Sequence, residues 1–282
     1  MQHAGSRSFS LVRLTSYAYL ALIGVFAIFP FYWMLINSLK APNEVFAIPP
    51  TYFPSEVSFD SYTNLFASNS MFPRNMLNSF IVATSTAVLA TLIATMAGYS
   101  FSKFRFPGNR PISYSLFLTQ MFPVAAILVP LFIIFQRLGL YNTLGALILA
   151  GMAFSVPVAI WLMIGFFDAI PSELIDAALI DGASQIGVLF RIILPISVNG
   201  IVATTMYIFI SAWSELLFAV TFTSSRELAT LPVALSNFTG QYGTDWTGMM
   251  AASVLTALPV AIIFLSLQRF FVEGITSGAV KN

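Results

Sequence analysis

The stretch 138–167, "LGLYNTLGALILAGMAFSVPVAIWLMIGFF", runs from one end to the other without a charged side chain. A helix needs about 20 apolar residues to cross a bilayer, and a Lys, Arg or Asp at the bilayer centre costs roughly 2.5 to 3.5 kcal/mol. This stretch is therefore long enough and apolar enough to span a membrane. Charge-free stretches of the same kind recur at 14–39, 75–102, 111–136, 192–214 and 246–268.

The composition agrees with six such spans. Of the 282 residues, 58% are hydrophobic and 8% are charged, whereas soluble domains carry roughly 25% charged residues. We therefore predict an all-α polytopic membrane protein with six transmembrane helices, the fifth of which continues to about Thr221 and places Glu215 near its far end. The net charge of +1 argues against a nucleic-acid partner. No cysteine and a single histidine, His3, argue against a metal enzyme.

The distribution of basic residues predicts the topology. We expect a cytoplasmic leader over 1–13, a six-span domain over 14–272 and a cytoplasmic C-terminal tail over 273–282. With both ends inside, the inner segments hold eight basic residues and the outer segments hold four, as the positive-inside rule requires. The inner set is Arg7, Arg13, Lys103, Arg105, Arg110, Arg191, Arg269 and Lys281, and the outer set is Lys40, Arg74, Arg137 and Arg226.

Five prolines lie inside the predicted spans: Pro30, Pro123, Pro130, Pro157 and Pro259. Each lacks a backbone donor and can kink its helix, which would suit a pathway that opens and closes. Proline is also simply commoner in membrane helices than in soluble ones, so either explanation holds for any one of them.

The outer connection 40–74 alternates prolines with aromatic residues. Short helices in this loop would present the aromatic side chains to an external partner. The alternative is that the same side chains rest at the level of the lipid headgroups.

The inner connection 168–194 has the pattern of a soluble helix, a turn and a second helix. Pro171 and Ser172 start the first helix, Glu173 lies in its first turn, and Gly182 makes the turn. We expect Pro195 to close the second helix. Four acids against one arginine give the segment a net charge of about −3 on the side where basic residues are usual. We therefore expect it to dock in a basic groove of another protein; the alternative, a helix lying on the bilayer, would normally be rich in Lys and Arg.

These residues resemble the inner-membrane permease subunits of binding-protein-dependent ATP-driven (ABC) importers, in the maltose-type sugar branch. The signature of that family is Glu-Ala-Ala, three residues, Gly, nine residues, and Ile-x-Leu-Pro. Here it is Asp176-Ala177-Ala178, Gly182 and the stretch 192–195, with Asp176 in place of the glutamate. The stretches "FYWMLINSLK", "NSFIVA", "KFRFPGNR" and "QRFFVEGITSGAVKN" are also similar to the family.

The resemblance implies the type I ABC importer permease fold, with a cytoplasmic coupling helix that docks in a cleft of a separate ATP-hydrolysing subunit. The residues it assigns to this coupling are Glu173, Asp176, Ala177, Ala178, Asp181, Gly182, Leu189, Phe190 and Pro195. The chain has no phosphate-binding loop, because none of its three lysines follows a glycine-rich turn. We therefore expect no catalysis and no cofactor in this chain, with ATP and Mg on the partner subunits.

The resemblance also implies an inner-membrane complex in a bacterium or archaeon, which contains an ATPase dimer, a second permease chain and an external sugar-binding protein. This chain would form half of a sugar pathway, and Trp213, Ser214 and Glu215 are candidates for its lining. The partner permease could hold the sugar alone. An ion-coupled secondary transporter is the alternative function, but it would normally place ionisable residues at mid-membrane. An intramembrane enzyme would need a nucleophile with a base, or clustered acids and histidines, and the single histidine, His3, lies outside the spans.

Overall fold

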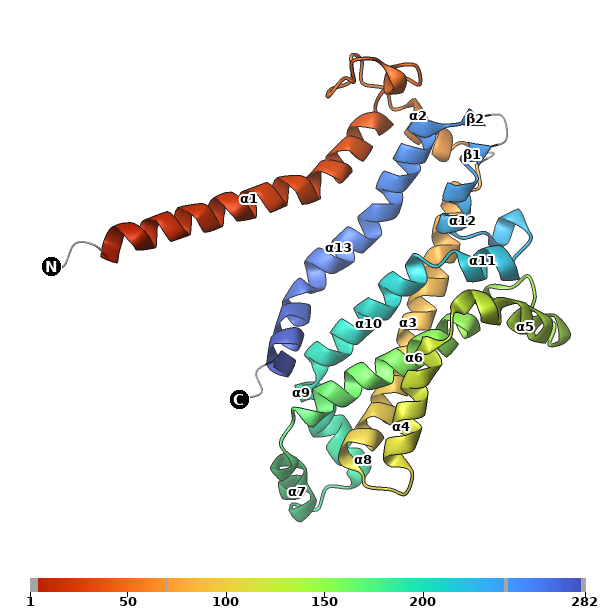
Figure 1. Cartoon of the computed structure of the whole chain (residues 1–282). Coiled ribbons are helices and arrows are strands. Elements are labelled where there is room, and N and C mark those ends of the chain that lie inside the picture. Colours follow the sequence, from red (N-terminus) through yellow and green to blue (C-terminus); the bar gives the residue numbers. More distant parts are fainter. Residues whose placement is uncertain (1–4, 69, 241–242, 280–282) are drawn as a thin grey trace. The chain divides into compact units, whose positions relative to one another are not determined.

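The computed structural model describes residues 5–68, 70–240 and 243–279, and most of them are helical (Figure 1). The chain divides into two compact units, one made of 1–70 and 237–257 and the other of 71–236 and 258–282. Each unit is described by itself.

The first unit begins with the long helix α1 (Gly5–Ser38), whose side chains from Arg13 on are mostly exposed, as in a helix that faces lipid or another chain. Its other elements are η1 (Glu44–Phe46), α2 (Asp60–Leu65), the antiparallel strands β1 (Thr239–Gly240) and β2 (Gly243–Thr244), and the start of α13 (Trp246–Ala279). The loop after α1 is organised around the buried Lys40. Its Nζ donates to the carbonyl of Thr51 at 2.6 Å and lies 4.9 Å from the centre of the Trp33 ring.

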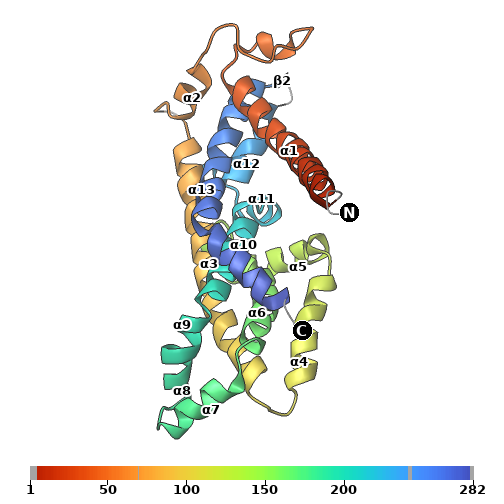
Figure 2. The same ribbon diagram turned by 90° about the vertical axis from the view of Figure 1, so that its left-hand side faces the viewer.

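The second unit is built on three helices that pack against one another, α3 (Phe72–Lys103), α6 (Leu144–Asp168) and α10 (Val198–Trp213) (Figures 1 and 2). Small side chains line the contact between α3 and α6 and let the two backbones approach closely. These are Ala83, Ala87, Ala90 and Ala94 on α3, and Ala146, Ala150 and Ala159 on α6, all of them 0 or 1% exposed. At Gly98 a β-carbon would lie 2.7 Å from Cβ of Met163.

The membrane assignment of the sequence is confirmed, with one correction. Four described helices are long and apolar enough to cross a membrane, and two bent pairs bring the number to six if each pair is one span. The predicted spans 111–136 and 192–214 are not straight. The first is α4 (Asn109–Leu118) with η2 (Thr119–Met121), followed by α5 (Val124–Arg137) after a 99° bend.

The second bent pair joins the helical run 185–196 to α10 through a 76° bend at Ser197.

In the first pair the bend coincides with Pro123, and the preceding Phe122 takes the extended conformation that a following proline imposes. The other four span prolines lie inside helices: Pro30 in α1, Pro130 in α5, Pro157 in α6 and Pro259 in α13.

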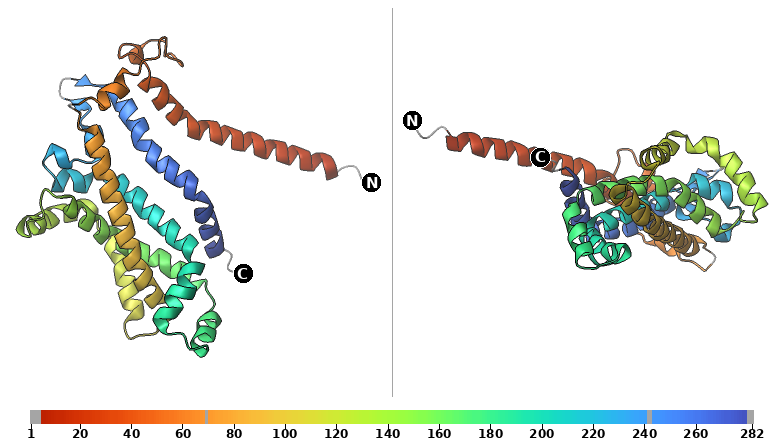
Figure 3. Two further views of the ribbon diagram at one scale, coloured as in Figure 1. Left: turned by 180° about the vertical axis from the view of Figure 1, so that it is seen from behind. Right: turned by 90° about the horizontal axis from the view of Figure 1, so that it is seen from below.

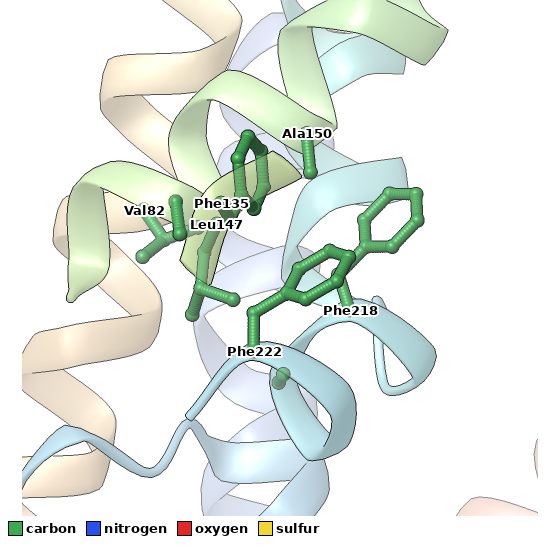
Figure 4. Close-up of a cluster of buried hydrophobic side chains, with 8 residues drawn as sticks. Val82, Phe135, Leu147, Ala150, Phe218 and Phe222 are labelled. Atoms are coloured by element: carbon green, nitrogen blue, oxygen red, sulfur yellow. The ribbon is translucent and has the colours of Figure 1, made fainter. Parts of the chain in front are cut away.

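A hydrophobic cluster fixes α5 against α6 and the short helix α11 (Leu217–Phe222) (Figure 4). The ring of Phe222 lies between those of Phe135, 5.0 Å away edge to face, and Phe218, 5.8 Å away and nearly parallel. Leu147 and Ala150 of α6 complete the contact. After α11 the chain continues through η4 (Arg226–Leu228) and α12 (Leu231–Ser236).

Side-chain amides of α3 hold this last segment. Nδ2 of Asn78 donates to the carbonyls of Glu227 and Ala229 at 2.8 and 2.9 Å, and the backbone N–H of Leu231 donates to Ser79 Oγ at 2.8 Å. These bonds satisfy polar groups that are buried among apolar helices, where an unpaired group is costly.

The predicted leader and tail lie partly outside the described residues. The structure does not describe residues 1–4 and 280–282, and the latter range includes Lys281. Helix α1 begins at Gly5, and helix α13 continues to Ala279. Most of the leader and of the tail is therefore helical. The predicted outer loop 40–74 contains the short helices η1 and α2.

Candidate coupling site

The predicted helix, turn and second helix between 168 and 194 are confirmed. Helix α7 (Ser172–Ile180) starts after Pro171, with Glu173 in its first turn. Its end is a Schellman motif: Gly182, at φ +86°, donates to the carbonyl of Leu179 and Ala183 donates to that of Ala178. Glycine takes this left-handed conformation without the steric cost that a β-carbon brings.

The second predicted helix begins with a side-chain N-cap and continues beyond its predicted end. Ser184 Oγ accepts the N–H of Gly187 at 3.1 Å and caps α8 (Gln185–Val188). A π turn, η3 (Leu189–Ile193), and α9 (Leu194–Ile196) follow.

The prediction that Pro195 closes this helix is wrong. The helical run passes Pro195 and breaks at Ser197. The π turn has already shifted the hydrogen-bond ladder before Pro195, so the missing N–H of the proline is accommodated within the run.

One face of this region combines exposed apolar side chains with acids, and we call it the coupling surface. Ile180 is 86% exposed, Ile186 71% and Phe190 61%. The same region carries the exposed acids Glu173, Asp176 and Asp181, together with Ala177; Glu173 and Asp176 also line the cavity beneath α7 described below. Exposed apolar side chains gathered in this way are typical of protein interaction sites. The other predicted residues have different places: Ala178 and Leu189 are buried, and Pro195 is exposed outside this surface.

α7 and α8 lie at one end of the second unit, beside the last turns of α3 and α6 (Figures 2 and 3). A cavity of about 730 Å³ separates the inner side of α7, with Ile175 and Leu179, from the end of α3, with Tyr99 and Arg105. It is large compared with the voids of a close-packed interior.

Two hydrogen bonds join α3 to the connection that precedes α7, which we call the root (168–171). Ser102 Oγ donates to Asp168 Oδ1 at 2.6 Å, and Lys103 Nζ donates to the carbonyl of Ile170 at 2.7 Å. Sequence reasoning missed this role of Ser102 and Lys103. The two bonds link positions 66 and 67 residues apart, and a pattern read within one helix carries no information about such contacts.

The three candidate pathway residues do not share one environment. Trp213 is 3% exposed and its ring stacks on Phe209 at 5.6 Å, so it packs inside the bundle. Ser214 is exposed just after α10. Glu215 Oε1 accepts the N–H of Phe218 at 3.1 Å, beside a small cavity that Thr230 also lines.

Among the residues that the structure describes, no group of three or more His, Cys, Asp or Glu side chains is placed to hold a metal ion.

Comparisons with known proteins place these features in a family. The family model described as "Binding-protein-dependent transport system inner membrane component" matches residues 90–277. The inner membrane ABC transporter permease protein YcjP of Escherichia coli is 35% identical over 275 residues, which are 97% of this chain and 98% of that protein. The trehalose/maltose transport system permease protein MalG of Thermococcus litoralis is 33% identical, over 93% of this chain and 94% of that protein.

A solved structure has the same fold. A chain in the crystal structure of a bacterial ABC transporter involved in the import of the acidic polysaccharide alginate matches with a TM-score of 0.78. The match covers 96% of this chain and 99% of that chain, at 20% identity.

Proposed function

The chain belongs to the family of binding-protein-dependent transport system inner membrane components, and from that premise we propose that it is the permease subunit of an ATP-driven sugar importer. Permease subunits are multi-pass inner-membrane proteins without catalytic activity of their own. A sugar substrate is supported by the trehalose/maltose permease at 33% identity. Family membership favours this function over an ion-coupled transporter.

The coupling surface is the observation that carries the proposal. It presents Ile180, Ile186 and Phe190 for burial in a cleft, with the acids Glu173 and Asp181 beside them for contact with basic groups. Burial of apolar area contributes roughly 25 cal/mol per Å², and complementary charge adds specificity. We assign the cleft to an ATPase subunit that binds ATP and Mg, and this places α7, both termini and the root on the cytoplasmic side.

The remainder of the complex follows from the same role. A second, different permease chain supplies the other half of the pathway, and an external sugar-binding protein delivers the substrate. Within this chain Ser214 and Glu215 are the better pathway candidates, because Trp213 packs against Phe209. Hydroxyl and carboxylate groups are suited to the hydroxyl groups of a sugar.

A charge reversal tests the docking. We expect Asp181→Lys to lower recovery of the ATPase subunit when the permease is purified from membranes, because the lysine repels a basic cleft. Glu56→Lys is the matched control, since Glu56 is also an exposed acid but lies in the loop 40–74. If Asp181→Lys and Glu56→Lys retain the ATPase equally well, the acidic face is not the docking site.

A transport assay separates the two function classes. In proteoliposomes we expect sugar uptake only when the ATPase, ATP and the binding protein are all supplied. Uptake by the permease alone, driven by an ion gradient, would support the ion-coupled transporter instead.

A further inference from the structure

We propose that Ser102 and Lys103, in the last turn of α3, are positioning residues that transmit movement of the coupling surface into the helix bundle. The inference rests on the proposed function and adds to it the point at which the movement enters the spans. It is drawn from the two bonds at the root, the cavity beneath α7 and the packing of α3 on α6.

The two bonds act on the root itself. Ser102 donates to the carboxylate of Asp168, the last residue of α6, and Lys103 donates to the carbonyl of Ile170 two residues later. Both bonds involve a charged partner, and such bonds are shorter and stronger than neutral ones. The ammonium group also lies near the C-terminal end of α6, where a positive charge is favoured.

The carboxylates near Lys103 reinforce this arrangement. Desolvation lowers the pKa of Lys103, and Asp168, in the root, and Glu173, just after it, oppose that shift by favouring the charged ammonium group. A shift of α7 that moves Glu173 and the Ile170 carbonyl together therefore acts on the same ammonium group at the end of α3.

The cavity directs the movement to the root. Because an open volume of about 730 Å³ lies between the inner side of α7 and the end of α3, α7 can be displaced without pushing directly on Tyr99 or Arg105. The root, by contrast, is bonded to α3. Displacement of α7 is thus passed to α3 through Ser102 and Lys103.

Just beyond the root, α3 and α6 are in close contact. The Tyr99 ring meets that of the fully buried Phe167 edge to face at 5.8 Å, and Gly98 lies against Met163 at a distance that excludes a β-carbon. Packed helices can still shift slightly past one another. Because the root continues α6 through the backbone, movement of α7 reaches α6 directly, and the two bonds carry it on to α3.

Two labels on the intact complex with its ATPase subunits test the inference. The chain has no cysteine, so single spin labels can be placed at Ile180→Cys on the coupling surface and at Leu92→Cys, an exposed position in the middle of α3. MgATP is the only ligand that is added. In the unmodified chain we expect MgATP to change the spectra of both labels.

In Lys103→Met and Ser102→Ala we expect the Ile180 label to respond as before. The response of the Leu92 label should fall in both variants, because each lacks one of the two bonds to the root. Ser100→Ala is the matched control, because Ser100 Oγ bonds to the carbonyl of Met96 within α3. Arg105→Met removes a positive charge from the same cavity without touching either bond to the root, and should also leave both responses intact.

The outcomes separate the inference from the function on which it rests. If the ATPase does not copurify with the unmodified chain, or the Ile180 label ignores MgATP, the proposed function fails. If the ATPase copurifies and the Leu92 label responds in Lys103→Met and Ser102→Ala as in Ser100→Ala, the inference is overturned and the function stands. A Leu92 label that does not respond even in the unmodified chain also overturns the inference. Ser102→Ala, the smaller change, keeps the test available should Lys103→Met fail to fold.

Discussion

Replacing Gly182 by alanine isolates the turn that shapes the coupling surface. Nothing lies within 4 Å of the position that the new β-carbon would take, so a steric clash with a neighbour does not contribute. What remains is the left-handed backbone at φ +86°, which costs an alanine roughly 1 to 2 kcal/mol. That energy corresponds to a factor of about 5 to 30 in the ratio of molecules that keep the Schellman turn to molecules that lose it.

The assay is the affinity of purified ATPase for the permease in lipid nanodiscs. For Gly182→Ala we expect the dissociation constant to rise, by up to about 30-fold, because docking must first restore the turn. Gly182→Asn should recover most of the affinity, since asparagine accepts the left-handed conformation. Gly165→Ala, in the regular helix α6 with no atom within 4 Å of its β-carbon, is the control. Wild-type affinity in Gly182→Ala would refute the reasoning.

Two further predictions concern packing and pH. Gly98→Ala should lower the melting temperature of the detergent-solubilised chain, because its β-carbon would overlap Met163 and overpacking costs typically 1–3 kcal/mol. Gly24→Ala, at an open position in α1, is the control and should melt like the unmodified chain. Equal melting temperatures of the two variants would contradict the close contact at Gly98. In the loop after α1, desolvation acts to raise the pKa of Glu44, but hydrogen bonds from Ser55 and Thr51 and the nearby Lys40 outweigh it and lower the pKa from 4.5. A carboxyl group whose pKa is lower in the folded chain than in the unfolded chain stabilises the fold at pH values above its unfolded-state pKa. That stability is lost as the pH falls through its folded-state pKa, so proteolysis of this loop should accelerate below about pH 4.5. Glu44→Gln should weaken that pH dependence, and an unchanged profile would exclude Glu44 as its cause.

The spans could be predicted from the sequence because the bilayer imposes a simple rule on charge. Charges within an apolar run are costly, so their spacing predicted 75–102 and 138–167, close to the observed α3 and α6. Helix α7 was predictable for a similar reason. Its signals, Pro171, Glu173 and Gly182, are local and act within a few residues of one another.

The two bends were not predictable, because the presence of a proline does not by itself decide where a span bends. Pro123 lies at a 99° bend and Pro195 lies two residues before the 76° bend at Ser197, whereas Pro157 lies inside a helix that continues on both sides. Which of these positions bends depends on packing against other helices. The root was missed for the same reason, since the bond from Ser102 to Asp168 joins two helices far apart in the sequence.

The central claim is that an ATPase subunit docks on the coupling surface, and photo-crosslinking tests it most directly. A benzophenone maleimide is attached in native membranes to a single cysteine, either at Ile180, which is 86% exposed on that surface, or at Ile48, which is 97% exposed in the loop after α1. The account predicts that the label at Ile180 captures the ATPase subunit and that the label at Ile48 does not. Capture of the ATPase from Ile48, with none from Ile180, would contradict it.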